Sequence, residues 1–367
     1  MLLESIEVNN FRNLTGGVTW GNDLNIIGGE NGQGKTNWIE AIYLLATSKS
    51  YRTQRLQEVI SFDQDFTTIN GRVAHSSHIY RDLEVAIQAN TKTISLNGKR
   101  EVITNYLGQL HPILFTGEEL KTVREGPELR RRFLDRGIVS HQKSYIQTLA
   151  DYERILKQKN RLLQSVTERG ISIQEARVLV EPWNEQLVHL GEIIHRSRCD
   201  YANSLEGILK YSFFDKEVIT IRYISFLKEK GDIHNYKEVF AERLNSKFQA
   251  EIASGYALLG PHRDDLEILF DGRYIRTYGS SGQQRTALIS LDLAAIELYH
   301  SWHKEYPIFL LDDVDAELDQ HRISSLIEYL KGRTQTFMTT SKEDLLQRFA
   351  SHAAIYNVSR GSAIKIN

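Results

Sequence analysis

A glycine-rich segment near the N-terminus has the residues and spacing that hold a phosphate chain. It reads GENGQGKT and fits the pattern GxxxxGK[ST], with the apolar run LNII before it and the helix-like run TNWIEAIYLLA after it. Its glycines let backbone N–H groups curl around an anion, and the N-terminus of the helix adds partial positive charge. Lys35 is expected to reach the β- and γ-phosphates of a nucleotide, and Thr36 to be a ligand of Mg²⁺. The predicted loop comprises Gly29, Glu30, Asn31, Gly32, Gln33, Gly34, Lys35 and Thr36.

Two adjacent carboxylates, Asp312 and Asp313, follow the apolar run IFLL near the C-terminus. An apolar run is typical of a buried parallel strand, and open α/β sheets bind ligands at the carboxyl ends of such strands. We therefore predict that both acids lie beside the phosphate loop. Asp312 would hold Mg²⁺, directly or through water, and Asp313 would orient or deprotonate the attacking water. Lys35 and Asp313 are thus the predicted catalytic residues.

A third motif, SSGQQR, precedes the amphipathic run TALISLDLAAIEL. It resembles the signature motif of ABC ATPases, whose serine and glycine N–H groups present a helix N-terminus to a γ-phosphate. That resemblance implies action in trans, with two chains enclosing two ATP molecules. Alone, the segment would be interpreted as a Ser/Gly cap that opens a helix. The residues expected to face the partner's ATP are Ser280, Ser281, Gly282 and Gln283.

The segments that follow Asp313 bear on the expected rate of hydrolysis. VDAELD, at residues 314–319, resembles the ABC D-loop. TFMTTS, at residues 336–341, stands where ABC proteins usually carry a switch histidine, and it contains no histidine. That role is either missing or taken by Thr340 or Ser341. Asp313 is also shorter than the glutamate usual in ABC pumps, so we predict a weak ATPase used as a switch.

The elements that must position these motifs are of two kinds. Strand-like runs dominate the first part of the chain, and the Asn-Gly pair at 97–98 predicts a hairpin turn between two of them. The middle of the chain is helical instead. Apolar residues recur at alternating spacings of four and three over 145–166, with Lys159 as the one polar member, and again over 183–201. Because Gly170 interrupts the pattern, the two runs predict an antiparallel helical hairpin.

The last third returns to α/β character, with strand-like runs at DLEILF and PIFLLDDV and a helix expected over 283–299. The whole pattern is that of an α/β domain interrupted by a helical insertion. We place the N-terminal part of the ATPase domain at residues 1–120, the insertion at residues 121–250, and the C-terminal part at residues 251–367.

Composition limits the classes to which the chain can belong. Of its 367 residues, 41% are hydrophobic and 25% charged, as in globular rather than disordered proteins. The single cysteine, Cys199, favours a reducing compartment, and neither a membrane-spanning run nor a signal peptide is expected. We therefore expect a cytoplasmic location. With 45 basic and 47 acidic residues the net charge is −2, so a nucleic-acid partner would have to bind local basic patches.

Several segments together resemble the RecF family of bacterial ATPases, which is related to SMC-type heads. They are the phosphate-loop block through ATSKSYRT, NFRN at residues 10–13, FTGEELKTVREGPELRRRFLD at 115–135, GYALLGPHRDDL at 255–266 and SSGQQRT at 280–286. Gly117 stands where the family more often has proline. The resemblance implies an α/β fold, an ABC/SMC-type P-loop ATPase domain with mixed sheets, split by a short coiled-coil-like helical hairpin.

The same resemblance implies partners and a reaction cycle. Members of the family bind ATP with Mg²⁺, form a homodimer on it and bind DNA as dimers. They act in DNA repair and at replication forks in the bacterial nucleoid, where they work with RecR and RecO to load RecA at single-strand gaps. By motif match, Arg12 and Asn13 would contact the nucleotide.

The candidate DNA-binding residues are chosen on charge alone. Residues 121–136 contain six basic and three acidic side chains. Arginines at phosphate backbones give affinity without sequence readout. The arginines could instead pair internally with acids, and the sequence does not choose between the two roles. The candidates for DNA contact are Arg124, Arg130, Arg131 and Arg132, with Lys99 and Arg100 near the predicted hairpin.

Other basic residues have weaker claims. Lys157, Lys159 and Arg161 are more typical of a solvated helical face. His262 and Arg263, in the GPHRDD segment, could serve the active site or lock a strand turn.

Two other functions fit the phosphate loop. A small-molecule kinase would need neither the signature motif nor a helical hairpin, and its ATP turnover would demand a substrate. A subunit of an ABC pump would need a surface that docks to membrane helices, and it usually carries the switch histidine.

Overall fold

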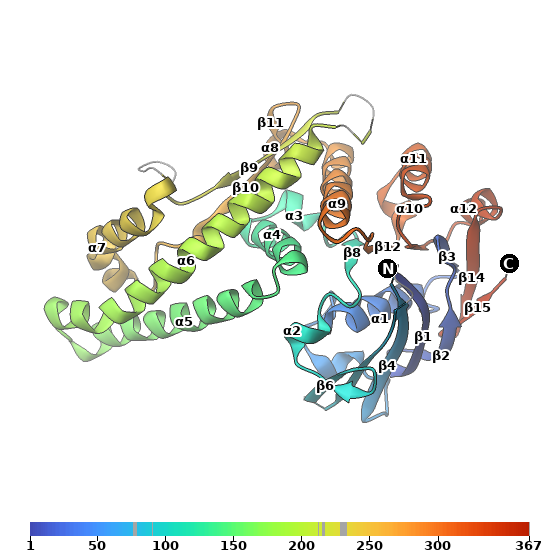
Figure 1. Ribbon diagram of the computed structural model, residues 1–367, viewed down its shortest axis with the longest axis horizontal. Coiled ribbons are helices and arrows are strands. Elements are labelled where there is room, and N and C mark those ends of the chain that lie inside the picture. The colour runs from blue at the N-terminus through green and yellow to red at the C-terminus, as the bar shows by residue number, and fades with distance from the viewer. Residues whose placement is uncertain (76–78, 90, 212, 215–216, 228–232, 367) are drawn as a thin grey trace. The chain divides into compact units, whose positions relative to one another are not determined.

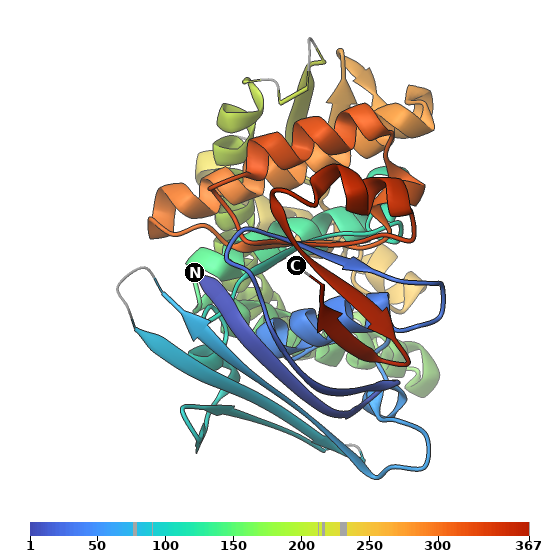
Figure 2. The same ribbon diagram turned by 90° about the vertical axis from the view of Figure 1, so that its right-hand side faces the viewer.

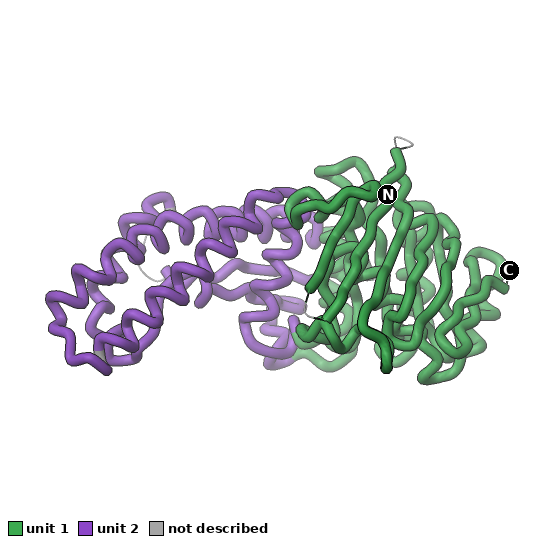
Figure 3. Tube along the Cα trace, turned by 90° about the horizontal axis from the view of Figure 1, so that it is seen from below, with its two compact units in different colours: residues 1–121, 211–217, 279–367 green, residues 122–210, 218–278 purple. Residues whose placement is uncertain are grey.

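The structure, a computed structural model, describes residues 1–75, 79–89, 91–211, 213–214, 217–227 and 233–366. The chain divides into two compact units (Figure 3). Unit 1 contains residues 1–121, 211–217 and 279–367, and unit 2 contains residues 122–210 and 218–278. Residues 251–278, which the sequence analysis placed with the ATPase domain, thus belong to unit 2, because their main strand pairs with a strand of that unit.

Unit 1 contains a mainly parallel sheet of six strands, in the order β15-β14-β3-β13-β12-β8. Only the β14–β15 pair is antiparallel. Every residue of β3, β12 and β13 is buried, as expected for strands covered on both faces. The strands are β3 (Leu24–Gly28), β8 (Pro112–Phe115), β12 (Ile308–Leu311), β13 (Thr336–Thr339), β14 (Ala353–Ser359) and β15 (Ser362–Lys365).

The second sheet of unit 1 is antiparallel, in the order β2-β1-β4-β5-β6-β7. Figure 2 shows its long strands side by side in blue to teal. The predicted turn at 97–98 is confirmed, since Asn97 and Gly98 both have positive φ and join β6 to β7. The strands are β1 (Leu2–Phe11), β2 (Leu14–Thr19), β4 (Phe66–Ala74), β5 (Tyr80–Gln88), β6 (Thr91–Leu96) and β7 (Lys99–Arg100).

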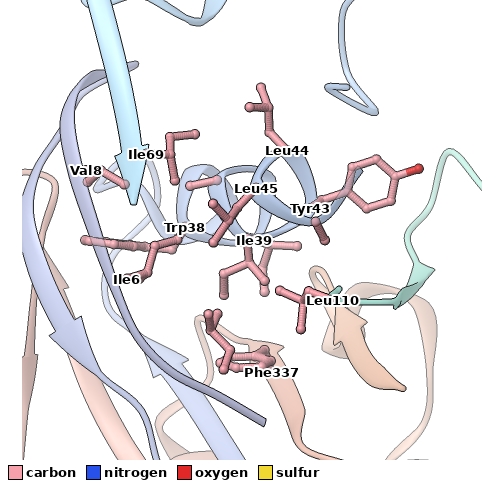
Figure 4. Packing of buried hydrophobic residues seen from close by; sticks show 14 of the residues in the cluster. Ile6, Val8, Trp38, Ile39, Tyr43, Leu44, Leu45, Ile69, Leu110 and Phe337 are labelled. Atoms are coloured by element: carbon pink, nitrogen blue, oxygen red, sulfur yellow. The ribbon is translucent and has the colours of Figure 1, made fainter. Parts of the chain in front are cut away.

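Helix α1 (Lys35–Thr47) packs against strands of both sheets and carries much of the core of unit 1 (Figure 4). Trp38, Ile39 and Leu45 are fully buried on it. A Cβ at Gly71 of β4 would overlap the side chain of Leu45, so glycine allows the helix its close approach to the sheet. Since replacing a buried leucine with alanine costs about 2–5 kcal/mol of the free energy of unfolding, this helix is firmly anchored.

The other helices of unit 1 follow its strands or connect them. Helix α9, predicted over 283–299, is longer at both ends and packs against β8. The helices are η1 (Leu56–Val59), α2 (Ile103–Tyr106), α9 (Ser281–His303), α10 (Val314–Glu317), α11 (Gln320–Leu330) and α12 (Glu343–Phe349).

Unit 2 contains the predicted helical hairpin, made of α5 (Tyr145–Arg169) and α6 (Ile173–Leu209), which lie side by side in Figure 1. Gly170, with φ 64°, ends α5, and Ser172 caps α6 by accepting a hydrogen bond from the Glu175 N–H. Helix α6 begins ahead of the predicted run at 183 and continues through Pro182.

A three-stranded antiparallel sheet, in the order β11-β10-β9, and further short helices complete unit 2. The strands are β9 (Ile219–Ile224), β10 (Asp265–Phe270) and β11 (Arg273–Tyr274). The helices are α3 (Lys121–Arg124, which begins at the boundary), α4 (Pro127–His141), η2 (Ile233–Asn235), α7 (Tyr236–Ser254), η3 (Pro261–Arg263) and α8 (Ile275–Tyr278). In the described part of the chain, no helix has both the length and the apolarity needed to cross a bilayer.

The polar seam position, Lys159, is fully buried and forms an ion pair with Glu251 of α7, with 2.6 Å between Nζ and Oε2. The second oxygen of Glu251 accepts a hydrogen bond from the Leu258 N–H. Burial lowers the pKa of Lys159, while Glu251 acts in the opposite direction. The prediction that this segment forms a solvated face is therefore confirmed for Lys157 and Arg161, which are exposed, and is wrong for Lys159, which is buried.

Candidate nucleotide site

Three neighbouring parallel strands of unit 1 bring the predicted site together. Strand β13 lies between β3, which leads into the phosphate loop, and β12, which leads into the two acids. Because parallel strands end at the same edge of a sheet, the segments after them meet there. Asp312 lies within hydrogen-bond distance of Thr36, with 3.0 Å from its Oδ1 to the threonine Oγ1. The predicted neighbourhood of the loop and the acids is present.

The phosphate loop folds around the side chain of Lys35. Its Nζ donates hydrogen bonds to the carbonyl oxygens of Gly29, at 2.7 Å, and Glu30, at 2.9 Å. Gly34, with φ 116°, forms the N-cap of α1, a left-handed conformation that favours glycine. Burial lowers the pKa of Lys35, against the opposing effect of nearby acids led by Asp313. The ammonium therefore lies within the turn of the loop, beside the N-terminus of α1.

Thr36 and Asp312 suit a magnesium ion. Mg²⁺ is bound by oxygen atoms, usually one or two protein groups together with phosphate oxygens. The hydroxyl of Thr36 donates to the carboxylate of Asp312, so both oxygens are near enough to serve one ion. Asp312 is 8% exposed, so its own carboxylate is largely shielded from water.

Thr339, at the end of β13, connects the two acids. Its hydroxyl donates to Oδ1 of Asp312 at 2.8 Å and accepts from the backbone N–H of Asp313 at 2.7 Å. Of the two residues proposed for the switch position, Thr340 is fully buried and accepts a hydrogen bond from the Lys342 N–H. Thr339 was missed in the sequence, although it lies in the TFMTTS segment that marked this place.

Asp312 has another partner, Tyr51, which lies in the ATSKSYRT end of the phosphate-loop block and was given no role from the sequence. The Tyr51 hydroxyl donates to Oδ2 of Asp312 at 3.2 Å. Burial raises the pKa of Tyr51, and the charge of Asp312 raises it further. The phenol therefore stays protonated and acts as a donor to the carboxylate.

Asp313, the predicted general base, lies directly after Asp312 at the N-cap of α10. It has φ 53°, a left-handed backbone at the residue before α10. Burial raises the pKa of its carboxyl group, and the charges of Asp315 and Asp312 raise it further. A carboxylate with a raised pKa is a stronger base than an ordinary aspartate.

Arg12, expected at the nucleotide, is held on the flank of α1. Its guanidinium binds both oxygens of Glu40, at 2.8 and 3.1 Å. Glu40 is completely buried, and it also accepts a hydrogen bond from Arg52 at 3.0 Å. An isolated buried carboxylate is costly, so these two arginines make its burial possible.

Asn13 contacts the phosphate loop, since its Nδ2 donates to the carbonyl oxygen of Gln33 at 3.3 Å. The turn between β14 and β15 holds the same glutamine from another direction. The backbone N–H groups of Arg360 and Gly361 donate to the side chain and the carbonyl of Gln33, at 2.8 and 2.9 Å. A Cβ at Gly361 would overlap the backbone of Asn13, so glycine permits this contact.

The signature segment forms a complete helix cap. The Ser280 hydroxyl accepts from the Gln283 N–H, while the Gln283 side chain accepts from the Ser280 N–H. Ser280 and Ser281 are both exposed. Arg322 of α11 donates to the carbonyl oxygen of Gly282 at 3.1 Å. The helix cap inferred from the sequence is therefore present, and its serines face solvent.

The DNA candidates divide into buried and exposed groups. Arg130 is buried and binds both oxygens of Asp265, at 2.7 and 2.9 Å. Arg131 donates to the carbonyl oxygen of Asp264 at 2.7 Å. These contacts favour the internal role for both arginines. The exposed candidates are Arg124, Arg132, Lys99 and Arg100.

His262 and Arg263 make their contacts inside unit 2. The Nδ1 of His262 lies 2.7 Å from the hydroxyl of Tyr152, and burial lowers the pKa of His262 to about 4. Arg263 donates to the carbonyl oxygen of Ala257 at 3.2 Å and lies over the ring of Tyr256. The structure thus favours the locking of a turn over a role in the active site.

Comparison with known proteins matches the whole chain to one family. The family model for the RecF/RecN/SMC N-terminal domain matches residues 2–363. A protein of Bacillus pumilus described as DNA replication and repair protein RecF is 36% identical over 373 residues, which cover 99% of this chain and 100% of that protein. A protein of Halothermothrix orenii with the same description is 38% identical over 350 residues, covering 93% and 92%.

Solved structures agree with this similarity. One is described as the recombination mediator protein RecF with ATP in the RecFOR pathway. It has a TM-score of 0.89 and 29% identity, and the match covers 100% of this chain and 98% of that one. The Smc head domain of Pyrococcus furiosus, with a TM-score of 0.57, 15% identity and coverage of 100% and 96%, shares the fold.

Proposed function

This chain belongs to the RecF family of SMC-like head proteins, and from that premise we propose that it is an ATP-binding recombination mediator of DNA replication and repair. The mediator role rests on the family, and the observation that carries the ATP-binding part of the proposal is the contact between Thr36 and Asp312. It joins the phosphate loop to the acids at one edge of the parallel sheet, the arrangement that nucleotide binding with Mg²⁺ requires.

At the nucleotide, the backbone N–H groups of residues 29–34 and the ammonium of Lys35 would bind the phosphates. Thr36 and Asp312 would hold Mg²⁺, which when bound neutralises charge on the phosphate oxygens. Asp313 would orient a water molecule and accept its proton. Because this base is an aspartate and the TFMTTS segment has no histidine, we propose slow hydrolysis that resets a switch.

We further propose that ATP joins two chains. Ser280 and Ser281 are exposed at the N-terminus of a 23-residue helix, where backbone N–H groups and the helix dipole favour an anion. The γ-phosphate bound at Lys35 of one chain would be that anion for the other. Loss of the γ-phosphate on hydrolysis would then open the dimer.

The dimer would hold DNA through exposed basic residues. We propose that the exposed residues Lys99 and Arg100 on β7 and Arg124 and Arg132 of unit 2 contact DNA phosphates. Arg132 also forms an ion pair with Glu128 at 2.6 Å. Through the family we propose RecR as the direct partner, with RecO and RecA downstream at single-strand gaps. Such work implies a cytoplasmic, nucleoid-associated location.

Light scattering tests the nucleotide switch directly. The purified protein is measured without nucleotide, with ADP, and with ATP and Mg²⁺. We expect the mass to double only with ATP, because only ATP offers a γ-phosphate to Ser280 of the second chain. If the measured mass does not change on addition of ATP, even when DNA is present, the proposed ATP-joined dimer is contradicted.

Charge reversal tests the DNA surface. Lys99→Glu with Arg100→Glu should weaken DNA binding by the ATP-bound protein about tenfold or more at low salt. Binding through fewer phosphate contacts releases fewer counterions from the DNA, and the affinity falls accordingly. Lys157→Glu with Lys247→Glu makes the same charge change on exposed helical residues of unit 2 and serves as the control. Equal losses in both variants would contradict a specific role for β7.

A further inference from the structure

The carboxylate of Asp312 is held by hydrogen bonds from separate segments of unit 1. Its Oδ1 accepts from Thr36 at 3.0 Å and from Thr339 at 2.8 Å. Its Oδ2 accepts from Tyr51 at 3.2 Å. Thr36 belongs to α1 and Thr339 to β13, whereas Tyr51 lies in the segment that follows α1, outside the GENGQGKT loop.

The backbone around Tyr51 is fixed on both sides. The Ser50 hydroxyl donates to Oε1 of Glu40 at 2.6 Å, and it accepts from the backbone N–H of Arg52 at 3.0 Å. The guanidinium of Arg52 donates to the other oxygen of Glu40 at 3.0 Å. The ring of Tyr51 meets the ring of Tyr43 edge to face, with 5.4 Å between the centroids. The tyrosine hydroxyl is thus aimed at Asp312 by its neighbours.

Glu40 extends this arrangement to the NFRN motif. It is completely buried on α1 and binds the guanidinium of Arg12 through both of its oxygens. Arg12 therefore lies two contacts from Tyr51, through Glu40 and then Ser50 or Arg52. This connection gives Arg12 a way to act on the site through other side chains.

We propose that Tyr51 is a positioning residue that orients Asp312 for its divalent cation, and that Glu40 holds Tyr51 in place. The proposal rests on the proposed nucleotide site, in which Thr36 and Asp312 take Mg²⁺. A carboxylate has about four lone-pair positions. Two positions on Oδ1 are occupied by Thr36 and Thr339, and Tyr51 occupies one on Oδ2. The hydroxyl of Tyr51 therefore fixes the rotation of the carboxylate, and with it the directions in which the oxygens of Asp312 can meet a ligand.

A group that hydrogen-bonds to a metal ligand, without touching the metal itself, has a measurable effect on metal affinity in other proteins. Loss of a hydrogen-bond partner behind a metal ligand typically lowers metal affinity 10- to 100-fold. Tyr51→Phe removes the hydroxyl and keeps the ring that packs on Tyr43, so the change is confined to the contact with Asp312. Its effect should therefore fall on the cation and leave the binding of nucleotide alone unchanged.

The experiment measures the binding of a slowly hydrolysed ATP analogue while Mg²⁺ is titrated, and again in EDTA. For Tyr51→Phe we expect the Mg²⁺ concentration at the midpoint to rise about tenfold. The affinity for the analogue in EDTA should match that of the wild type. Tyr43→Phe is the matched control, because it removes a hydroxyl from the neighbouring ring of the same aromatic pair. Its midpoint should not move.

Ser50→Ala provides a second test that leaves the tyrosine hydroxyl intact. It removes the anchor between Ser50 and Glu40, so we expect a smaller rise of the Mg²⁺ midpoint, again without a change in EDTA. This variant decides the question if Tyr51→Phe fails to fold. A wild-type midpoint in Tyr51→Phe would overturn the proposal. So would equal shifts in the Tyr51 and Tyr43 variants, which would mark a packing effect.

The same titration separates this proposal from the proposed function. If the wild-type protein binds no ATP analogue, or binds it without any response to Mg²⁺, the nucleotide site itself is wrong. If the wild type responds to Mg²⁺ and Tyr51→Phe responds at the same concentration, only the role of Tyr51 fails.

Discussion

Arg322 of α11 donates a hydrogen bond from Nη1 to the carbonyl oxygen of Gly282 in the first turn of α9, at 3.1 Å. The same guanidinium binds Glu217 at 3.2 Å. A second contact runs parallel to it, since Arg285 of α9 forms an ion pair with Glu317 of α10 at 2.9 Å. The signature segment is therefore tied at two points to the chain that follows Asp313, once to the D-loop segment through Glu317 and once to α11 through Arg322.

Replacing Arg322 with alanine should weaken the ATP-induced dimer while each chain still binds ATP. Arg322 acts within one chain, so its loss would act by loosening the signature segment, and we expect the dimerisation constant to fall by at most about tenfold. Analytical ultracentrifugation with ATP measures the dimer, and equilibrium binding measures the nucleotide. Arg348→Ala is the control, because Arg348 contacts Ser324 and Gln320 of the same helix and leaves the signature segment untouched.

Replacing Lys35 with alanine should lower ATP affinity at least about tenfold. The ammonium is expected to bind two phosphates, and each charge-assisted hydrogen bond contributes about 1.5–3 kcal/mol. Titration with a fluorescent nucleotide measures the effect. Lys49→Ala, an exposed lysine just after α1, should bind ATP as the wild type does. If Lys35→Ala binds ATP with unchanged affinity, the assignment of residues 29–36 as a phosphate loop is wrong.

Replacing Ser280 with arginine should stop dimerisation and leave ATP binding largely intact. A large side chain at this exposed cap would stand where a second chain's γ-phosphate is expected. Light scattering with ATP and Mg²⁺ measures the dimer. Ser246→Arg, at an exposed position of α7, introduces the same side chain and should still dimerise. An ATP-induced dimer of Ser280→Arg would rule out the sandwich in this form.

Replacing Asp313 with asparagine should slow ATP hydrolysis and prolong the dimer. The amide cannot accept the proton of water, and loss of a general base typically costs about 10²–10⁴-fold in rate. Phosphate release in single-turnover experiments measures hydrolysis, and the decay of light scattering measures the dimer. A variant dimer that dissociates faster than the wild type would argue against this role.

The sequence revealed those parts of the site that are local patterns. The phosphate loop occupies eight consecutive positions, and the acids end a short apolar run, so both could be found without the fold. Thr339 and Tyr51 could not, because they contact Asp312 only after β13 and the segment after α1 reach the same edge of the sheet. Nothing in the spacing of a lone tyrosine indicates such a contact.

The boundary of the helical insertion has a similar explanation. The strand-like run at 265–270 was correctly recognised, but the pattern of a strand does not indicate which other strand it pairs with. It pairs with β9 of unit 2 in antiparallel register, from Asp265 opposite Ile224 to Phe270 opposite Ile219. The return to α/β character in the sequence thus precedes the final return of the chain to unit 1, which takes place at residue 279, after the short stretch of unit 1 at 211–217.

The buried pair of Lys159 and Glu251 has a consequence for the uniqueness of the helical hairpin. Moving α5 along its neighbours by one turn would place apolar residues against apolar residues again, but it would leave a buried ammonium and a buried carboxylate without partners. Breaking such a pair costs about 3–5 kcal/mol. That cost is comparable to a large part of the stability of a small domain. We therefore expect the charge pair to set the alignment of the helices. The repeating apolar seam alone would allow several alignments of similar free energy.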